Sequence, residues 1–361
     1  MKIVHTEAST GWGGQEIRTF NEAIALREKG HEIFFIIQYG AELAIKLKEN
    51  HFSVIEIFFQ KKFWPLSLIR IVYFLKKENV ELVVTHSSLD AWLGGIAAKI
   101  LKLPVIRIRH LSSKIKSGIN SRWLYNKLAD FIITTSSQII PSISQASGKS
   151  STHMECIPTG VDPKKFIVCE NKVNKLKEQW GVTKDDLVIG SLCVVRSWKG
   201  IDDLIEAANL LKDEPFIKWV VIGGGFLNHH RSKVKELKLE KKVIFTGHLD
   251  DPKEALASLD IFILLSTSSE GISQASLQAS YLKKPLITTE TGGLKEVCLD
   301  NITGLIVPIK DPYSVSCAVV KLKNKELRER LGENAYRHVK ERFLFDKTLQ
   351  DVENIYMRFS C

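Results

Sequence analysis

The sequence predicts an α/β protein made of two similar domains, each with a parallel β-sheet covered by helices on both faces. Its 361 residues are too many for one hydrophobic core. Short β-branched runs alternate with longer amphipathic stretches in both halves, a pattern typical of parallel strands joined by helices. A turn-rich segment at residues 158–163 separates the halves. We therefore expect two Rossmann-like domains that face each other across a cleft.

The first half begins with an expected strand at residues 2–6. A helix is expected at residues 15–29, because its apolar side chains recur at helical spacing. Gly30 then ends this helix. Further strands of the first half are expected at residues 32–37, 53–58, 82–85, 105–109 and 131–134.

The second half repeats this alternation and ends in charged helical sequence at residues 324–361. Its strands are expected at residues 188–195, 219–223, 243–246, 261–265, 285–288 and 304–307. Its helices are expected at residues 202–211, 230–237, 251–257, 273–281, 294–298 and 312–322.

The composition is that of an ordinary globular protein. Hydrophobic residues make up 44% and charged residues 25%, which excludes a disordered, collagen-like or disulfide-stapled chain. The cysteines show no CxxC pair and no regular spacing, which indicates reduced thiols in a cytoplasmic protein; they are Cys156, Cys169, Cys193, Cys298, Cys317 and Cys361. We expect no signal peptide and no membrane-spanning helix.

The positive charge is concentrated in the first half. The chain has a net charge of +10, and residues 1–165 carry 22 Lys and Arg against 14 Asp and Glu. Residues 166–361 are close to neutral. A partner attracted by charge, whether nucleic acid, an anionic membrane or an anionic small substrate, is therefore expected at the first half.

A glycine-rich motif, residues 10–16, lies between the first strand and the first helix. Glycines such as Gly13 and Gly14 allow a tight turn and the close approach of a ligand to backbone N–H groups at a helix start. A plain connecting turn is the alternative. The motif lacks the third glycine of the dinucleotide-binding pattern, because Ile17 follows instead.

Two further motifs follow strands of the second half. Arg196 and Lys199, in a turn that ends at Gly200, suit a diphosphate, because Arg binds phosphate oxygens as a fork and Lys as a point charge. A solvated basic turn is the alternative. Glu270 and Gln278 lie eight residues apart, about 12 Å along a helix, so an extended donor could contact both. The N–H groups after Gly271 would favour an anion.

Together these motifs resemble family 4 of the retaining nucleotide-sugar glycosyltransferases, which have the GT-B fold. The resemblance spans nearly the whole chain and is more specific in the second half. It also rests on residues 222–225 (Ile-Gly-Gly-Gly), 243–247 (Val-Ile-Phe-Thr-Gly), 268–271 and 285–293. The variants at residues 11–16, 85–88 and 107–112 resemble bacterial lipopolysaccharide-type members.

The resemblance implies a role for each matching residue. Arg196 and Lys199 would neutralise the donor diphosphate, and Glu270 would bond hydroxyls of the donor sugar. His110 would line the sugar site as a further catalytic residue; a structural hydrogen-bonding role is the alternative. Gln278 stands where the family usually has a glutamate for the ribose, so it would bind without a charge. The donor-binding set is completed by Gly13, Gly14, Gly224, Gly271, Ile272, Ser273, Gly292 and Gly293.

The family also implies a mechanism and a domain organisation. The acceptor would attack from the face that the phosphate leaves, with no metal and no cofactor, and no residue is assigned as general base. No DxD or HExxH motif stands in a suitable setting, and both Asp202-Asp203 and Asp250-Asp251 are interpreted as helix N-caps. We expect an acceptor-side domain at residues 1–165, a donor-binding domain at 166–340 and a C-terminal helix at 341–361 that returns to the first domain.

The surplus charge suggests where an acceptor binds. Residues 60–77 are apolar and aromatic between lysine pairs and suit a membrane interface; a core helix with solvated ends is the alternative. A second basic group comprises Arg107, Arg109, Lys114, Lys116, Arg122 and Lys127. A glycan or anionic lipid-linked acceptor would suit this half, on the inner face of the cytoplasmic membrane. Nucleic acid is not expected, because no recognised binding module is present.

We therefore expect a glycosyltransferase of cell-envelope polysaccharide or lipopolysaccharide synthesis. A nucleotide-sugar epimerase of the same fold is one alternative. An NAD-dependent oxidoreductase is another, but Phe35 and Gln38 stand near the place where an acidic ribose-binding residue is needed. A non-catalytic nucleotide-sugar-binding protein also remains open, because Gln278 replaces a glutamate.

Overall fold

The computed structural model describes residues 1–111, 115–268 and 270–360. The chain divides into two compact units, Met1–Thr159 with Asp346–Cys361 and Gly160–Phe345, which we call unit 1 and unit 2. Among the described residues, no helix combines the length and the apolar character needed to cross a membrane.

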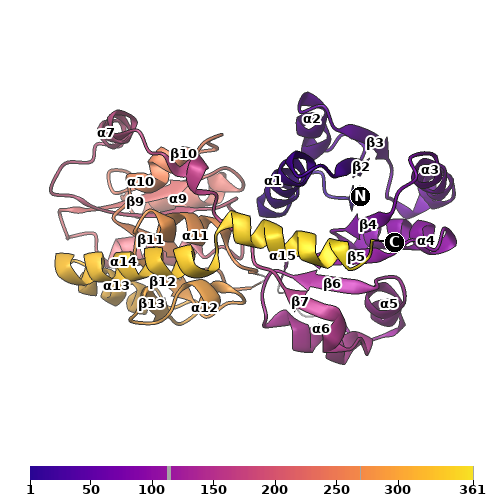
Figure 1. Ribbon diagram of the computed structural model, residues 1–361. Helices are drawn as coiled ribbons and strands as arrows, with labels where there is room; N and C mark the ends of the chain where they lie inside the picture. The colour runs from indigo at the N-terminus through magenta and orange to yellow at the C-terminus, as the bar shows by residue number, and fades with distance from the viewer. Residues whose placement is uncertain (112–114, 269, 361) are drawn as a thin grey trace. The chain divides into compact units, whose positions relative to one another are not determined.

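Unit 1 is built on a parallel sheet with the strand order β3-β2-β1-β4-β5-β6-β7 (Figure 1). Its strands are β1 (Lys2–Glu7), β2 (Glu32–Gln38), β3 (Ser53–Ile57), β4 (Leu82–Thr85), β5 (Val105–Arg109), β6 (Phe131–Thr134) and β7 (Met154–Cys156). The strand order reverses between β1 and β4, as in Rossmann folds. Open α/β sheets bind ligands beyond the carboxyl ends of the strands at such a reversal.

Helices cover the sheet of unit 1 and bury its strands on both faces. In β2, for example, every residue after Glu32 is buried, as expected for a parallel strand with helices on either side. The longer helices are α1 (Gly14–Glu28), α2 (Glu42–Glu49), α3 (Trp64–Lys77), α4 (Ser88–Ile100) and α6 (Ile139–Ser147). The short segments are η1 (Lys61–Phe63), α5 (Ile119–Ser121), the π-helical η2 (Arg122–Lys127) and η3 (Ser151–His153).

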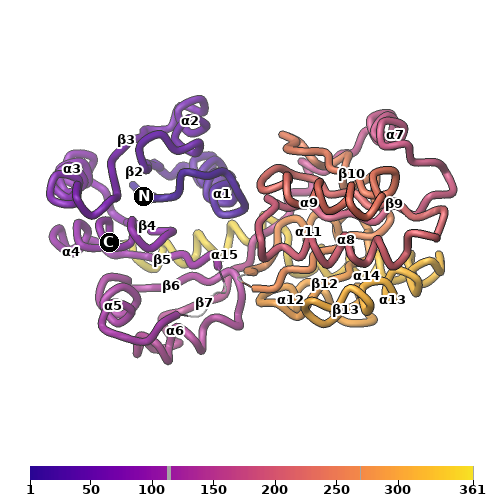
Figure 2. The backbone as a smooth tube through the Cα atoms, turned by 180° about the vertical axis from the view of Figure 1, so that it is seen from behind, coloured from indigo at the N-terminus to yellow at the C-terminus, as the bar shows by residue number. Residues whose placement is uncertain are grey.

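The C-terminal helix α15 (Phe345–Met357) packs on unit 1 (yellow in Figures 1 and 2). Val352, Ile355 and Tyr356 are fully buried. The Glu353 carboxylate contacts both Lys29 and His31, and Nε2 of His31 lies 3.1 Å from Oε1. Residues more than 300 positions apart in the sequence therefore share one core.

Unit 2 has a second parallel sheet, with the order β10-β9-β8-β11-β12-β13. This is the same Rossmann pattern, with the reversal between β8 and β11. Its strands are β8 (Leu187–Leu192), β9 (Ile217–Ile222), β10 (Val243–Gly247), β11 (Ile261–Leu264), β12 (Leu286–Thr289) and β13 (Gly304–Val307). Its helical segments are η4 (Pro163–Phe166), α7 (Glu170–Gln179), α8 (Ile201–Leu210), α9 (Leu227–Glu236), α10 (Lys253–Ala257), α11 (Gln274–Tyr281), α12 (Leu294–Val297), α13 (Pro312–Lys321) and α14 (Lys325–Arg342).

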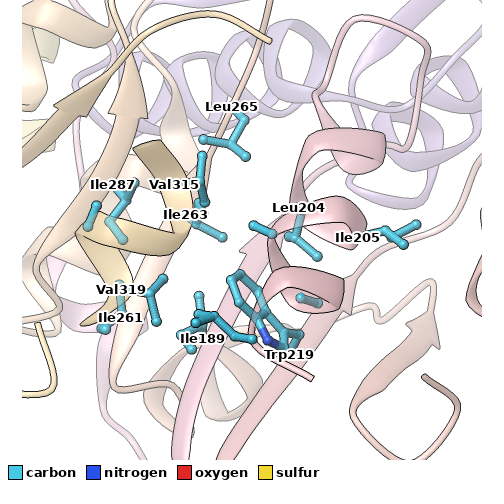
Figure 3. Close-up of a cluster of buried hydrophobic side chains, with 14 of the residues drawn as sticks. Ile189, Leu204, Ile205, Trp219, Ile261, Ile263, Leu265, Ile287, Val315 and Val319 are labelled. Atoms are coloured by element: carbon cyan, nitrogen blue, oxygen red, sulfur yellow. The ribbon is translucent and has the colours of Figure 1, made fainter. Parts of the chain in front are cut away.

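One core of unit 2 lies between the sheet and helices α8 and α13 (Figure 3). Trp219 of β9 packs there with Leu204 of α8 and Val319 of α13, and all three are almost completely buried. The helices are thus fixed against the strands whose carboxyl ends carry the predicted donor-binding residues.

The predicted fold class is confirmed, with local differences. The expected strand at residues 188–195 ends at Leu192, because the chain leaves the sheet there and Val195 forms only an isolated bridge to Gly225. Strand β7 and helix α7 were not expected. Strand β7 has only three residues, and α7 has no fully buried residue, so neither shows a clear hydrophobic period.

The packing of α15 predicts that Ile355→Ala destabilises the protein. Removing a fully buried isoleucine side chain leaves a cavity and should lower the free energy of unfolding by about 3 kcal/mol. Urea denaturation measures the change. Met357→Ala, at a half-exposed position of the same helix, is the control and should cost about 0.5 kcal/mol or less. Equal losses in the two variants would contradict the packing of α15.

Candidate functional site

The basic turn of unit 2 connects β8 to α8, and it is held against the chain that follows β11. Gly200 is the N-cap of α8 and has φ of +68°, a conformation that favours glycine. A Cβ atom at this position would overlap the Leu265 carbonyl oxygen. The Thr267 N–H also donates to the Trp198 carbonyl at 2.8 Å. The turn is thereby fixed at the reversal of strand order.

This arrangement brings two of the predicted site residues into direct contact. The Lys199 ammonium forms an ion pair with the Glu270 carboxylate. The Ser266 hydroxyl donates to the same Glu270 oxygen, Oε1, at 2.8 Å. The side chains of Lys199 and Glu270 are only 18% and 9% exposed, so little solvent weakens their attraction.

Arg196 lies at the start of the same turn and is exposed. The Lys199 N–H donates to the Arg196 carbonyl at 3.0 Å, which closes the turn. The Arg196 guanidinium lies 5.3 Å from the centre of the Trp198 ring. One exposed and one nearly buried cation are thus held within four residues of each other.

The glycine pair at 292–293 supports the loop that carries Glu270. The Gly293 N–H donates to the Glu270 carbonyl at 3.1 Å, and the Leu294 N–H donates to Thr291 at 3.2 Å. A Cβ atom at Gly293 would lie 2.7 Å from the backbone of Gly271 and Ile272. Glycine is therefore required at position 293 for this close approach, and the N–H groups of Gly293 and Leu294 are both bonded within the protein.

The other predicted donor-binding residues of unit 2 lie near strand ends or at a helix start. Ser273 caps α11, and its hydroxyl accepts from the Ser276 N–H at 3.2 Å. Ile272 is buried beside this cap, and Gln278 is half-buried one turn further on. Gly224 follows β9 and lies next to His248. Ser269, which precedes Glu270, lies outside the described residues.

The glycine motif of unit 1 forms the predicted strand-to-helix turn. Gly13 is the N-cap of α1, and its N–H donates to the Glu16 carboxylate at 2.9 Å. Glu7, the last residue of β1, accepts from the Ser9 N–H at 2.9 Å and from the Gln15 side chain. Two carboxylates therefore fix the loop on either side of Gly13 and Gly14.

Glu7 is fully buried, and burial raises its pKa to about 8. The neighbouring Asp90 carboxylate adds to the shift in the pKa of Glu7, because two like charges so close together repel each other. The Glu7 side chain is thus a neutral acid over most of the physiological range. No sequence motif marks Glu7 as a site residue.

His110 follows β5 and lies in a stack of histidines. Its Nε2 atom is 3.0 Å from Nδ1 of His86, and Nε2 of His86 is 2.9 Å from Nδ1 of His5. Burial lowers the pKa of all three, to about 3 for His5. His86 lies in the segment 85–88 that helped to identify the family, but His5 carried no sequence signal.

The second basic group is not a continuous exposed surface. Arg107 was expected to add to the surface charge. It is instead buried, and its guanidinium lies 4.3 Å from the centre of the Tyr125 ring. Lys116, Arg122 and Lys127 are exposed. Lys114 lies outside the described residues.

The interpretation of Asp202-Asp203 as an N-cap was wrong, because Gly200 caps α8 and both aspartates lie in its first turn. At α10 the N-cap position is Pro252, but the Asp251 carboxylate beside it accepts from the Lys253 N–H at 3.3 Å, as a capping side chain does. Asp202 is the centre of a group that could hold a metal ion, because its Oδ1 atom lies 3.6 Å from His229 and 3.2 Å from His230. Lys233 lies 3.6 Å from the same oxygen, so an ammonium group already neutralises the carboxylate.

Comparisons with known proteins identify the class. The model of the glycosyl transferases group 1 matches residues 172–338, and that of glycosyltransferase family 4 matches residues 12–165. Because the two models together span most of the chain, the protein belongs to the family 4 glycosyltransferases. It is a retaining glycosyltransferase that uses a nucleotide sugar.

Individual relatives are distant. The N-acetyl-alpha-D-glucosaminyl L-malate synthase of Bacillus anthracis is 23% identical and covers 92% of this chain and 90% of its own. The UDP-Gal:alpha-D-GlcNAc-diphosphoundecaprenol alpha-1,3-galactosyltransferase of Escherichia coli is 25% identical, and the match covers 81% of this chain and 79% of the relative. The structure of Anabaena HepE in complex with UDP-glucose has a TM-score of 0.87 at 20% identity, covering 99% and 100%. It confirms the GT-B fold.

The burial of Glu7 predicts a specific dependence of stability on pH. The raised pKa means that the folded protein binds this proton more tightly than the unfolded chain does. Stability should therefore fall as the pH rises from the ordinary pKa of 4.5 to about 8. Glu7→Gln stays neutral, so it should be more stable than the wild type at pH 8, by roughly 2–4 kcal/mol.

Urea denaturation between pH 4.5 and pH 8.5 measures this difference. The two proteins should be nearly equal in stability at pH 4.5 and diverge above it. Glu28→Gln, on the exposed end of α1, is the control and should show no such divergence. A constant gap between wild type and Glu7→Gln across the range would show that Glu7 is not neutral at pH 7.

Proposed function

We propose that this protein transfers a sugar from a uridine diphosphate sugar to a lipid-linked or glycan acceptor in cell-envelope polysaccharide or lipopolysaccharide synthesis. The observation that carries the donor site is the nearly buried Lys199–Glu270 pair at the strand reversal of unit 2. The uridine nucleotide is supported by the E. coli relative, whose name specifies UDP-Gal, and by the HepE complex with UDP-glucose.

The pair and Arg196 match the chemistry of the donor. In the transition state, negative charge accumulates on the departing diphosphate, which Lys199 and Arg196 would neutralise. Glu270 would accept hydrogen bonds from hydroxyls of the donor sugar. Without donor, Lys199 and Glu270 satisfy each other, so donor binding would replace one ion pair with two sets of contacts to a single ligand.

The other predicted site residues are proposed to act within their own units. Gln278 would bond the ribose through its amide, and the Gly292–Gly293 segment would hold the Glu270 loop in place. In unit 1, Gly13 and Gly14 would allow the donor to approach the backbone, and His110 would contact the sugar. The transfer would require no protein base, because the departing phosphate oxygen would take the proton of the acceptor.

Helix α3 offers a surface for a lipid-linked acceptor. Its buried stripe includes Ser67, Ile71 and Phe74 and packs into unit 1. On the opposite stripe, Leu66 and Ile69 are both more than 60% exposed. The helix therefore belongs to the core on one side and leaves an apolar stripe uncovered on the other.

Cations surround this apolar stripe. We call Leu66, Ile69 and Tyr73 with the exposed Lys61, Lys62, Arg70, Lys76 and Lys77 the α3 face. At its edge, Phe58 packs between Tyr39 and Phe63, with ring centres 5.1 and 4.9 Å apart. Apolar and aromatic groups inside a rim of cations match the interface of an anionic membrane. The protein would then meet its acceptor on the inner face of the cytoplasmic membrane.

The donor site predicts the effect of substitutions at the ion pair. Lys199→Ala and Glu270→Gln should each lower kcat for sugar transfer by about 100-fold or more, because each removes a group that stabilises the transition state. Transfer of labelled sugar from UDP-sugars to bacterial membranes measures kcat. Activity in EDTA should be unchanged, because no metal takes part.

Glu290→Gln and Lys212→Ala remove the same kinds of charge at exposed positions and serve as controls. Circular dichroism and thermal denaturation show whether each variant is folded. UDP should raise the melting temperature of the wild type and raise it less in Lys199→Ala. Folded Lys199→Ala and Glu270→Gln with normal turnover would contradict the proposed site.

The α3 face predicts binding to anionic vesicles. The wild type should bind vesicles of phosphatidylglycerol and phosphatidylethanolamine, more weakly at high salt. The fourfold variant Lys61/Lys62/Lys76/Lys77→Ser should lose most of this binding, because each cation near such a surface contributes about 1 kcal/mol. Vesicle sedimentation measures the bound fraction.

The matched control removes four exposed lysines of unit 2, Lys172/Lys175/Lys212/Lys235→Ser, and should bind vesicles as the wild type does. Leu66/Ile69→Ser tests the apolar part of the α3 face separately and should also weaken binding. Equal loss in both fourfold variants would indicate an effect of net charge alone. Binding unchanged in every variant would leave α3 as a core helix with solvated ends.

A further inference from the structure

The three stacked histidines of unit 1 come from neighbouring strands. His5 lies in β1, His86 follows β4 and His110 follows β5. The ring of His86 stacks on the rings of His5 and His110, with ring centres 5.2 and 5.3 Å apart, respectively. The nitrogens face each other in pairs, 2.9 Å apart between His5 and His86 and 3.0 Å between His86 and His110.

All three rings are neutral at physiological pH. Burial is the main cause of their lowered pKa values, and for His86 the two neighbouring imidazoles lower the pKa further. Arg18 and Arg109 act in the same direction on the pKa of His110. A neutral imidazole has one N–H donor and one bare acceptor nitrogen, so each contact in the stack needs a hydrogen from one side only.

The direction of the hydrogen bonds through the three histidines follows from Thr19. The Thr19 hydroxyl donates its single hydrogen to the Gln15 carbonyl at 3.0 Å, because a carbonyl oxygen can only accept. Toward Nδ1 of His86, 3.4 Å away, the Thr19 oxygen is therefore an acceptor. The hydrogen of His86 is thus on Nδ1, between Thr19 and Nε2 of His110.

The other two tautomers are then determined. Nε2 of His110 accepts from His86, so the hydrogen of neutral His110 is on Nδ1. The bare Nε2 of His86 accepts from Nδ1–H of His5, which leaves Nε2 of His5 as a bare acceptor. That atom is buried and has no hydrogen-bond partner among the described residues. The reverse direction would instead leave an N–H donor at this buried end.

We propose that His86, oriented by Thr19 and His5, is a positioning residue that fixes His110 as the Nδ1–H tautomer. His110 then presents a hydrogen-bond donor, and its other nitrogen is occupied by His86. It recognises a lone pair on its ligand, such as that of a sugar hydroxyl or phosphate oxygen, and does not act as a general base. The contact to the donor rests on the proposed function, whereas the tautomer is a property of the ligand-free protein.

Nuclear magnetic resonance of the full chain labelled with ¹⁵N-histidine tests the tautomers directly. His5, His86 and His110 should each show a protonated Nδ1 and a bare Nε2, without titration between pH 6 and pH 8. Substitution of each histidine in turn assigns its signals. A hydrogen on Nε2 of His110 in the wild type, or an imidazolium at pH 7, would overturn the inference.

Two substitutions separate positioning from packing. His86→Asn retains an N–H donor near the position of Nδ1 and should keep the tautomer of His110. His86→Phe keeps an aromatic ring but has no donor, so the Nδ1–H signal of His110 should be replaced by a mixture of tautomers. An unchanged His110 spectrum in folded His86→Phe would overturn the role of His86.

Kinetics then test the part that rests on the proposed function. With a UDP-sugar as the varied substrate, His86→Phe should lower kcat/KM about tenfold, and His86→Asn should lower it by less. His153→Phe, at an exposed position of unit 1, should have no effect. Normal kinetics in His86→Phe with the expected tautomer change would reject a donor contact of His110 and leave the tautomer assignment in place.

Discussion

The reversal of strand order in each sheet is the constraint on which the candidate site depends. Where neighbouring connections leave in opposite directions, the chain does not cover the carboxyl ends of the two central strands. In unit 2 these are β8 and β11, and the segments that follow them carry Lys199 and Glu270. In unit 1 they are β1 and β4, followed by the glycine turn and His86. The same topology thus places the candidate site residues of each unit beyond the carboxyl ends of its two central strands.

The sequence predicted the parts of the site that lie in contiguous motifs. The segments around Arg196 and Glu270 follow apolar strands and differ from ordinary turns in their glycines and charges, so both the fold class and these positions could be inferred. It did not show that Lys199 and Glu270 form an ion pair, because 71 residues separate them. Only the pairing of β8 with β11 brings their segments together.

The buried polar network of unit 1 could not be predicted for a related reason. His5 and Glu7 lie with Thr6 at the polar end of β1, and such residues usually satisfy a local hydrogen bond. Their significance arises from neighbours that are distant in the sequence: His86, which follows β4, contacts His5, and Asp90 of helix α4 lies near Glu7. Arg107 shows the opposite error: a residue counted as surface charge proved to be buried against Tyr125.

Burying so many ionisable groups opposes folding, and the two units offset this cost in different ways. In unit 2 the Glu270 carboxylate is paired with the Lys199 ammonium, an arrangement that is costly to break unless a ligand replaces the lost partner. In unit 1 the shifted pKa values keep Glu7 and the histidines neutral, so their hydrogen bonds depend on where single hydrogens lie. Unit 2 is therefore suited to respond to an anionic donor through charge. Under the proposed function, unit 1 would discriminate among ligands by the direction of its hydrogen bonds, which changes little with salt or with pH near neutrality.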